Sequence, residues 1–250
     1  MIVASRIFWG DIYFERSDIA SALYLYEQSL ELSRRIHDLF MIGIAAGSLA
    51  YLFVDQGNYE KAQPLFEEQL QINEKLQFRL GIGAALFGLG DLCRHQRDYV
   101  RADQYLKKSL IFSRDLGLQG NTSFTLYLLS MLALHQNDYS AAGWRFREYF
   151  DFARAREEKI TICRFLTGIS AVAGATNRPE HCAKLYGAAQ AALQSSKFRM
   201  DPFDRAEFDR HIQIANEQLG DARFEAEVAE GHAMTIEHAI QYALELSASA

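Results

Sequence analysis

The chain has 250 residues, 49% of them hydrophobic, so it is long enough to bury a substantial core in one or two domains. Its formal charge of −6 is uneven: residues 1–200 carry 23 basic and 21 acidic side chains, and residues 201–250 carry 3 and 11. Because this balance gives no broad basic surface, we expect no direct binding to nucleic acid. Proline occurs only three times, which favours long helices joined by short loops.

The ends of the sequence and its cysteines indicate an ordinary reducing compartment. The first residues lack the basic stretch and long apolar run of a signal peptide, and no apolar run approaches the roughly 20 residues that span a bilayer. Cys93, Cys163 and Cys182 are odd in number and far apart, so we expect buried free thiols. We therefore predict a cytoplasmic protein with no membrane partner.

The sequence repeats itself every forty residues. A column of small residues comprises Ala22, Ala62, Ala102, Ala142 and Cys182. Four positions later a column of large residues comprises Tyr26, Phe66, Leu106, Phe146 and Tyr186. Three positions before the small column, a third column comprises Ile19, Tyr59, Tyr99, Tyr139 and Pro179. Twelve positions before it, a fourth column comprises Gly10, Ala50, Gly90, Ser130 and Ser170. Four columns in register over five copies indicate five repeats of one structural unit.

Each repeat is predicted to be two antiparallel helices, because small residues on both helices let the backbones approach while the large residue fills the next groove. First helices are expected at about residues 2–16, 41–56, 80–96, 121–136 and 160–176, and second helices at about 19–37, 59–76, 99–116, 139–157 and 179–196. Asp18, Asn58, Asp98 and Asp138 precede second helices as N-caps. The repeats should form one cooperative solenoid over residues 1–200. Their bounds are about 2–38, 41–78, 80–118, 121–158 and 160–198.

The segment Gln56-Gly57-Asn58-Tyr59-Glu60-Lys61-Ala62-Gln63-Pro64-Leu65-Phe66 resembles the tetratricopeptide consensus. The resemblance implies an all-α, right-handed α-α superhelix. The usual period of that repeat is 34, so the six extra residues would lengthen the helices or the turns between repeats. HEAT repeats have a similar period and are the alternative fold, but they do not account for the paired small positions and the aromatic column.

The period ends after residue 200. Asp201-Pro202 is a strong helix start and Gly220 a helix stop, followed by a helix over about residues 221–230 ended by Gly231 and a third from Thr235 to about Leu246. These helices are predicted to form an acidic segment, residues 201–250, that caps the open end of the solenoid.

Motifs that carry chemistry are weak. Gly81, Gly83, Gly88 and Gly90 lack the strand and the Lys-Ser/Thr of a phosphate loop and are interpreted as helix-packing residues. His95 and His135 occupy one repeat position, too far apart to share a metal, and are interpreted as surface histidines with ligand contact as the alternative. The carboxylate pairs 67–68 and 157–158 are interpreted as solvated helix faces. We expect no enzyme activity, no catalytic residues, no cofactor and no metal.

The first helices of such a solenoid line a concave groove. Its candidate binding residues are Asp11, Phe14, Glu15, Tyr51, Asp55, Phe87, Asp91, Arg94, His95, Tyr127, Met131, His135 and Arg164. Aromatic, acidic and a few basic side chains together suit a peptide, a protein segment or a small polar ligand. The acidic residues would repel a C-terminal carboxylate tail.

The second half of the chain resembles one particular group of repeat arms. Its segments 179–190, 219–224 and 230–244 are similar to the C-terminal arm of bacterial LuxR-type regulators with a STAND-class nucleotide-binding domain. The resemblance implies an arm that senses a protein partner or a small-molecule inducer. The chain has no P-loop and no recognisable helix-turn-helix, so nucleotide and DNA binding do not carry over. A stand-alone scaffold or adaptor is the alternative, and a helical enzyme is a distant third.

Overall fold

The structure is a computed structural model that describes residues 2–156, 159–193 and 200–247. Over these residues every regular element is a helix. The chain divides into two compact units, Met1–Thr122 and Ser123–Ala250, hereafter unit 1 and unit 2. The division falls within a helix, and the predicted boundary at residue 200 stays a prediction.

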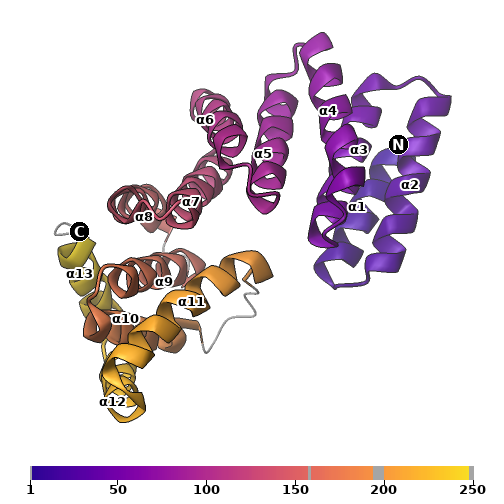
Figure 1. The fold of residues 1–250 in the computed structure, drawn as a ribbon. Helices are drawn as coiled ribbons and strands as arrows, with labels where there is room; N and C mark the ends of the chain where they lie inside the picture. The colour runs from indigo at the N-terminus through magenta and orange to yellow at the C-terminus, as the bar shows by residue number, and fades with distance from the viewer. Residues whose placement is uncertain (1, 157–158, 194–199, 248–250) are drawn as a thin grey trace. The chain divides into compact units, whose positions relative to one another are not determined.

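Unit 1 is built from three helical hairpins (Figure 1). Its helices are α1 (Ile2–Glu15), α2 (Ile19–Arg35), α3 (Leu39–Asp55), α4 (Tyr59–Lys75), α5 (Arg79–His95) and α6 (Tyr99–Asp115). Within a hairpin the two helices pack on each other, and α3 and α5 also pack on the hairpin before them. Each pair of helices therefore buries its apolar face on both its partner helix and its neighbouring hairpin.

The helix ends follow directly from the local sequence. Asp18, Asn58 and Asp98 each accept a hydrogen bond from the backbone N–H three residues on, at 3.2, 3.4 and 3.1 Å, which confirms them as N-caps. Left-handed residues recur in the turns every twenty residues from Ser17 to Asn137, namely Ser17, His37, Gly57, Gln77, Arg97, Gly117 and Asn137, and another is Asn177. Helices α2 to α6 each have 17 residues. The extra residues of the forty-residue period therefore lengthen the helices.

The repeated columns are the packing positions of the hairpins. Ala22 and Ala62 have no exposed surface, and a Cβ at Gly10 would lie 2.5 Å from the ring of Tyr26. A Cβ at Gly88 would lie 2.3 Å from Phe66, and one at Gly90 would lie 2.7 Å from Leu106. The glycines of α5 are thus close-approach residues, as predicted.

Unit 2 contains two further hairpins and three C-terminal helices. Its elements are α7 (Gln119–His135), α8 (Tyr139–Ala153), the 3₁₀ turn η1 (Arg154–Arg156), α9 (Lys159–Ala175), α10 (Pro179–Leu193), α11 (Pro202–Leu219), α12 (Asp221–His232) and α13 (Ile236–Ser247). The predicted ends of the second helices at residues 157 and 196, and the pair at 157–158, lie outside the described residues.

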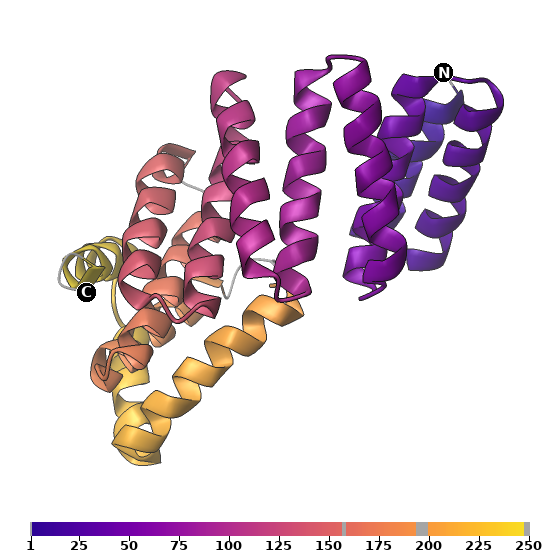
Figure 2. The ribbon, with the colours of Figure 1, turned by 45° about the horizontal axis from the view of Figure 1, so that its top comes forward.

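The three C-terminal helices take different places in unit 2. Figure 2 shows α11 as the long orange helix, which packs on α9 and α10. Helix α12 runs against α10 so closely that a Cβ at Gly187 would lie 2.1 Å from the carbonyl oxygen of Val228. The prediction that Gly231 ends this helix is wrong: α12 continues to His232, and Gly231 is a close-approach residue beside the carbonyl of Lys184. Helix α13 packs on α8, α9 and α10.

The three cysteines are buried free thiols, as predicted. Burial raises the pKa of Cys163 to about 12 and that of Cys182 to about 11, so both stay protonated and unreactive. Within the described ranges, none of the helices combines the length and apolar character needed to cross a membrane.

Candidate functional site

The predicted groove residues fall into columns on the first helices of the hairpins. Phe87, Asp91 and His95 stand four residues apart on α5 and so share one face of that helix. Forty residues on, the same positions of α7 hold Tyr127, Met131 and His135. The two sets lie in different units and have different surroundings, which are described separately.

In unit 2, the face of α7 is covered by α11. The hydroxyl of Tyr127 donates to Oδ2 of Asp204 over 3.0 Å, and Asp204 is 2% exposed. The ring of His135 lies 4.5 Å from that of Phe203, centroid to centroid. Met131 has no exposed surface. Two predicted groove positions of unit 2, Tyr127 and His135, are therefore already in contact with a helix of the same unit.

Helix α11 presents a carboxylate to a cluster of basic side chains. Glu207 lies 3.7 Å from Nδ1 of His135, 3.0 Å from Nε2 of His211 and 2.5 Å from Nη2 of Arg210. Burial raises the pKa of Glu207, but the hydrogen bonds with His135, His211 and Arg210 outweigh it and hold this pKa well below its usual range. The interpretation of His135 as a surface residue is wrong, since its side chain is 4% exposed.

Arg164 contributes a cation to the same surface of unit 2. Its guanidinium lies 4.5 Å from the ring centroid of Tyr127 and 4.9 Å from that of Phe124. The two rings are stacked, with centroids 6.1 Å apart. Arg164 and Tyr127 are therefore brought together, as expected for positions on one face, through cation–π contacts.

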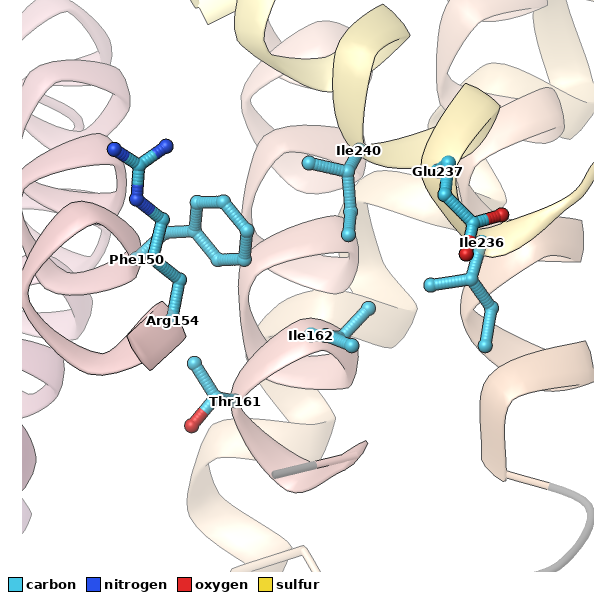
Figure 3. Close-up of a pocket in the computed structure, with 7 residues that line it drawn as sticks. All are labelled: Phe150, Arg154, Thr161, Ile162, Ile236, Glu237 and Ile240. Atoms are coloured by element: carbon cyan, nitrogen blue, oxygen red, sulfur yellow. The ribbon is translucent and has the colours of Figure 1, made fainter. Parts of the chain in front are cut away.

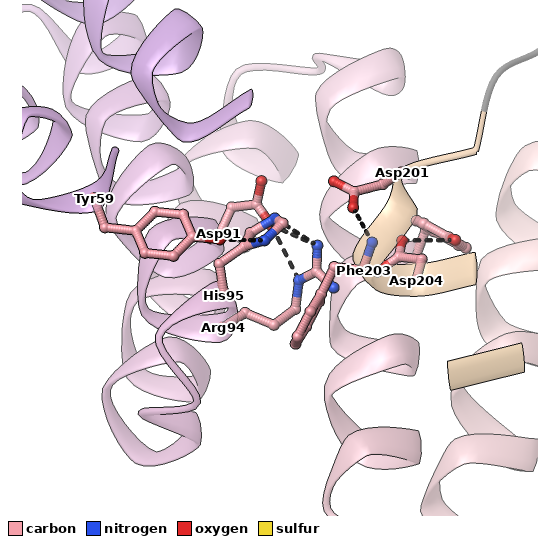
Figure 4. A network of polar contacts seen from close by, with 8 residues as sticks. Tyr59, Asp91, Arg94, His95, Asp201, Phe203 and Asp204 are labelled. Atoms are coloured by element: carbon pink, nitrogen blue, oxygen red, sulfur yellow. Dashed lines mark hydrogen bonds and ion pairs between the residues drawn. The ribbon is translucent and has the colours of Figure 1, made fainter. Parts of the chain in front are cut away.

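In unit 1, three candidates at the end of α5 form one polar network (Figure 4). Nη2 of Arg94 donates to Oδ1 of Asp91 over 2.8 Å, and His95 lies beside both. The hydroxyl of Tyr59 is 3.5 Å from Nδ1 of His95. The side chain of His95 is 7% exposed, so the surface interpretation is also wrong here. Asp91 is therefore largely neutralised by its own helix.

The candidates on α1 and α3 are more open. Tyr51 is half-buried, with its ring 4.9 Å from that of Phe66 and 6.4 Å from that of Phe87. Asp55 is exposed and Phe14 is half-buried. Helices α1 and α3 thus offer half-buried aromatic rings and exposed carboxylates.

The carboxylate of Asp11 is tied to the core by one short hydrogen bond. It is exposed at the residue level, and its Oδ1 accepts from the hydroxyl of Tyr26 over 2.6 Å. Partial burial raises the pKa of Asp11, and the hydrogen bond from Tyr26 opposes that rise. The carboxylate of Asp11 is thereby held in place by Tyr26.

Sequence reasoning missed the residues of α11 that engage α7. Phe203, Glu207 and His211 recur every four residues, and Asp204 lies beside them on the same face. This spacing was the available signal: a helix with polar and aromatic residues on its buried face lies against polar partners.

A separate pocket of about 440 Å³ lies in unit 2 between α8, α9 and α13 (Figure 3). Its lining is Phe150, Arg154, Thr161, Ile162, Ile236, Glu237 and Ile240. None of the predicted groove residues lines it. Arg154 is exposed and lies 3.6 Å from Asp151, whereas Thr161 is 3% exposed.

A metal centre has no counterpart in the part of the chain that the structure describes: no three His, Cys, Asp or Glu side chains are grouped to hold an ion there.

The hairpins of unit 1 resemble tetratricopeptide repeats. The tetratricopeptide repeat family model matches residues 2–75 and 41–115. No curated protein matches the sequence.

Solved structures share the fold at low sequence identity. BtubC (BKLC) from P. vanneervenii is 17% identical, with 89% of this chain and 92% of that chain covered and a TM-score of 0.64. Aspartyl phosphate phosphatase F from Bacillus subtilis is 12% identical, with 99% and 60% covered and a TM-score of 0.62. A STAND protein with a tetratricopeptide repeat sensor from Pyrococcus horikoshii is 16% identical, with 99% and 38% covered and a TM-score of 0.61. These likenesses show the fold.

Proposed function

We propose that this chain is a non-catalytic protein-binding arm that recognises a peptide or helical segment on the first helices of its repeats. The carrying observation is in unit 2, where the face of α7 binds α11 through Tyr127, His135 and their partners. A surface of this kind is suited to a helix laid along it, the helix-in-groove mode of recognition.

In unit 1 the surface proposed for an external partner comprises Asp11, Phe14, Tyr51 and Asp55, hereafter the α1–α3 face. Its two exposed or part-exposed carboxylates favour a partner with lysine or arginine side chains. Tyr51 and Phe14 offer half-buried rings against which apolar side chains can pack. A short basic peptide with aromatic or aliphatic residues is the class of partner that fits.

A sensor arm of a larger regulator is the context we propose for this binding. One structural neighbour is a STAND protein whose tetratricopeptide repeats are named as its sensor, and another is a Rap protein complexed with Competence and Sporulation Factor. The chain spans 60% of phosphatase F and 38% of the STAND protein. The LuxR-type family, a small-molecule inducer and a cytoplasmic location stay predictions from the sequence.

The binding proposal is tested by selecting peptides from a displayed random library against the purified chain. We expect enriched peptides to be basic and to contain apolar residues, and to lose binding when Tyr51 is changed to Ala. A matched control is Tyr24→Ala on α2, where the side chain is 63% exposed and lies outside the α1–α3 face. Enrichment of peptides that bind both variants alike would contradict the proposal.

The non-catalytic part has its own test. The purified chain should not hydrolyse ATP, since no P-loop motif is present in it. An ATP-hydrolysing activity that copurifies with the chain through successive columns would contradict the non-catalytic assignment. It would leave the peptide-binding test unaffected.

A further inference from the structure

The first helix of unit 1 exposes large apolar side chains on the side away from α2 and α3. Phe8 is 61% exposed, Trp9 51% and Ile2 64%, and Ile12 is half-buried. These four residues lie within about one third of the circumference of α1. They are hereafter called the α1 end face. Single exposed apolar residues are common, but four together on one helix face mark an interaction surface.

The repeat register identifies what this face is built to contact. Phe8 occupies the same position as Gly88 of α5 and Gly168 of α9. In both units that position meets the second helix of the preceding hairpin, because a Cβ there would lie 2.3 Å from Phe66 and 2.5 Å from Phe146 respectively. Phe8 therefore stands where a preceding hairpin makes contact.

The neighbouring columns give the same result. The positions equivalent to Trp9 hold Leu49, Leu89 and Ile169, which are 5%, 3% and 1% exposed. Those equivalent to Ile12 hold Leu52, Leu92 and Val172, which are 0%, 1% and 2% exposed. The α1 end face thus carries apolar residues at positions that are buried in later repeats. In α1 these positions are not covered by a preceding hairpin.

We propose that the α1 end face docks one further helical hairpin of the same forty-residue class, stacked ahead of α1 as the α1–α2 hairpin is stacked ahead of α3. The size of Phe8 specifies this partner. Where a glycine occupies the position of Phe8 in a later repeat, the second helix of the preceding hairpin fills the space with an aromatic ring. Because Phe8 itself fills that space, the residue opposite it must be small. The docked hairpin therefore carries a small residue where α4 carries Phe66.

A second copy of the chain does not supply such a hairpin at its other end. Helix α10 is the second helix of the last repeat, and α12 covers it with backbone contacts at Gly187 and Gly231. Head-to-tail stacking of two copies would have to remove α12. Face-to-face pairing of two α1 helices remains as an outcome that the experiment must detect.

The test joins a copy of residues 38–80, the α3–α4 hairpin with its cap, ahead of residue 1, which continues the forty-residue register. Trp144→Phe makes Trp9 the sole tryptophan, because the chain has two and the copied segment has none. Three extended chains are compared: the unchanged copy, a copy carrying Phe66→Ala, and the unchanged copy with Phe8→Gly in the chain. Acrylamide quenching of Trp9 reports whether the added hairpin covers the face.

We expect the Phe66→Ala copy to reduce quenching of Trp9 by roughly fivefold, toward the burial of its equivalents in later repeats. The unchanged copy should protect Trp9 poorly, since Phe66 and Phe8 compete for one space. Phe8→Gly should restore its protection by recreating the observed pair of Gly88 and Phe66. The rescue separates docking in register from misfolding of the added segment.

Two results would overturn the proposal. The first is that no extended chain protects Trp9, or that all three protect it equally whatever residue faces position 8. The second is that the unextended chain sediments as a dimer whose dilution exposes Trp9, because a second copy would then occupy the face. Neither result bears on the α1–α3 face.

Discussion

The hydroxyl of Tyr127 on α7 donates a hydrogen bond to Asp204 on α11 over 3.0 Å, and the two side chains are buried and 77 positions apart in the sequence. This contact fixes the first C-terminal helix on the hairpin helix that a solenoid would otherwise offer to a ligand. Removing one partner leaves a buried polar group short of one hydrogen bond, which costs more than the bond contributes on balance.

Tyr127→Phe should therefore lower the free energy of unfolding by about 1–3 kcal/mol. Chemical denaturation followed by circular dichroism measures the change. Tyr24→Phe, at a hydroxyl on the 63% exposed Tyr24, is the control and should have no effect. Equal stability of the two variants would show that the contact contributes nothing to unit 2.

The ion cluster of Glu207 predicts acid sensitivity. Burial raises the pKa of Glu207, but hydrogen bonds with His135, His211 and Arg210 more than compensate and depress it. A carboxyl whose folded-state pKa is depressed stabilises the fold above its unfolded pKa. This contribution is present at neutral pH and is lost as the pH falls below the usual value of 4.5 toward the depressed one.

Glu207→Gln should lower the thermal midpoint at pH 7, and the difference from the natural chain should narrow below pH 4.5. Thermal melts between neutral and acidic pH measure it. Glu225→Gln, at an exposed position of α12, should follow the natural chain at every pH. A difference at Glu207 that does not change with pH would mean that its charge is not what stabilises α11.

Close backbone approach predicts contrasting effects at two helical glycines. A Cβ at Gly187 would lie 2.1 Å from a backbone oxygen of α12, whereas at Gly43 the nearest atom would be 3.5 Å away. Gly187→Ala should cost about 3 kcal/mol through overpacking. Gly43→Ala should be neutral or stabilise by up to about 1 kcal/mol, because alanine favours a helix. Denaturant unfolding that ranks the two variants the other way would contradict the packing of α12 on α10.

The caps predict a modest and local effect. Oδ1 of Asp98 accepts from the N–H of Arg101, and this hydrogen bond is the first cause of the lowered pKa of Asp98. Asp98→Ala should lower the stability of the chain, and Asp98→Asn should lower it by less, because asparagine also caps. Thermal melts of the two variants provide the measurement, and an equal loss in both would show that charge rather than capping matters at this position.

The fold was largely predictable because the columns of the repeat are its packing positions. Small residues such as Ala22 and Ala62 fall where two helices must approach, so the forty-residue period specifies helix number, register and caps. The lengths of the helices were harder to predict from the sequence. Residues such as Gln77 and Arg97 adopt the left-handed conformation in turns, although they are not glycines.

The candidate surface was predictable only in part. The positions of Tyr127 and His135 on the groove side of α7 follow from the register, but their burial depends on α11, which lies outside the repeat. Likewise, the register does not say that Arg94 neutralises Asp91 on the same helix. Contacts of non-repeating segments carry no forty-residue signal, so the repeat register alone does not determine them.

The most direct test of peptide recognition by the α1–α3 face is the affinity of a selected basic peptide for a charge-neutralised chain. Fluorescence anisotropy should show the peptide binding roughly tenfold more weakly to the Asp11→Asn, Asp55→Asn double variant, with a smaller dependence on salt. The control double variant Glu60→Gln, Glu67→Gln removes the same charge from exposed positions of α4 and should bind as the natural chain does. Equal weakening in both double variants, or none in either, would contradict recognition by this face.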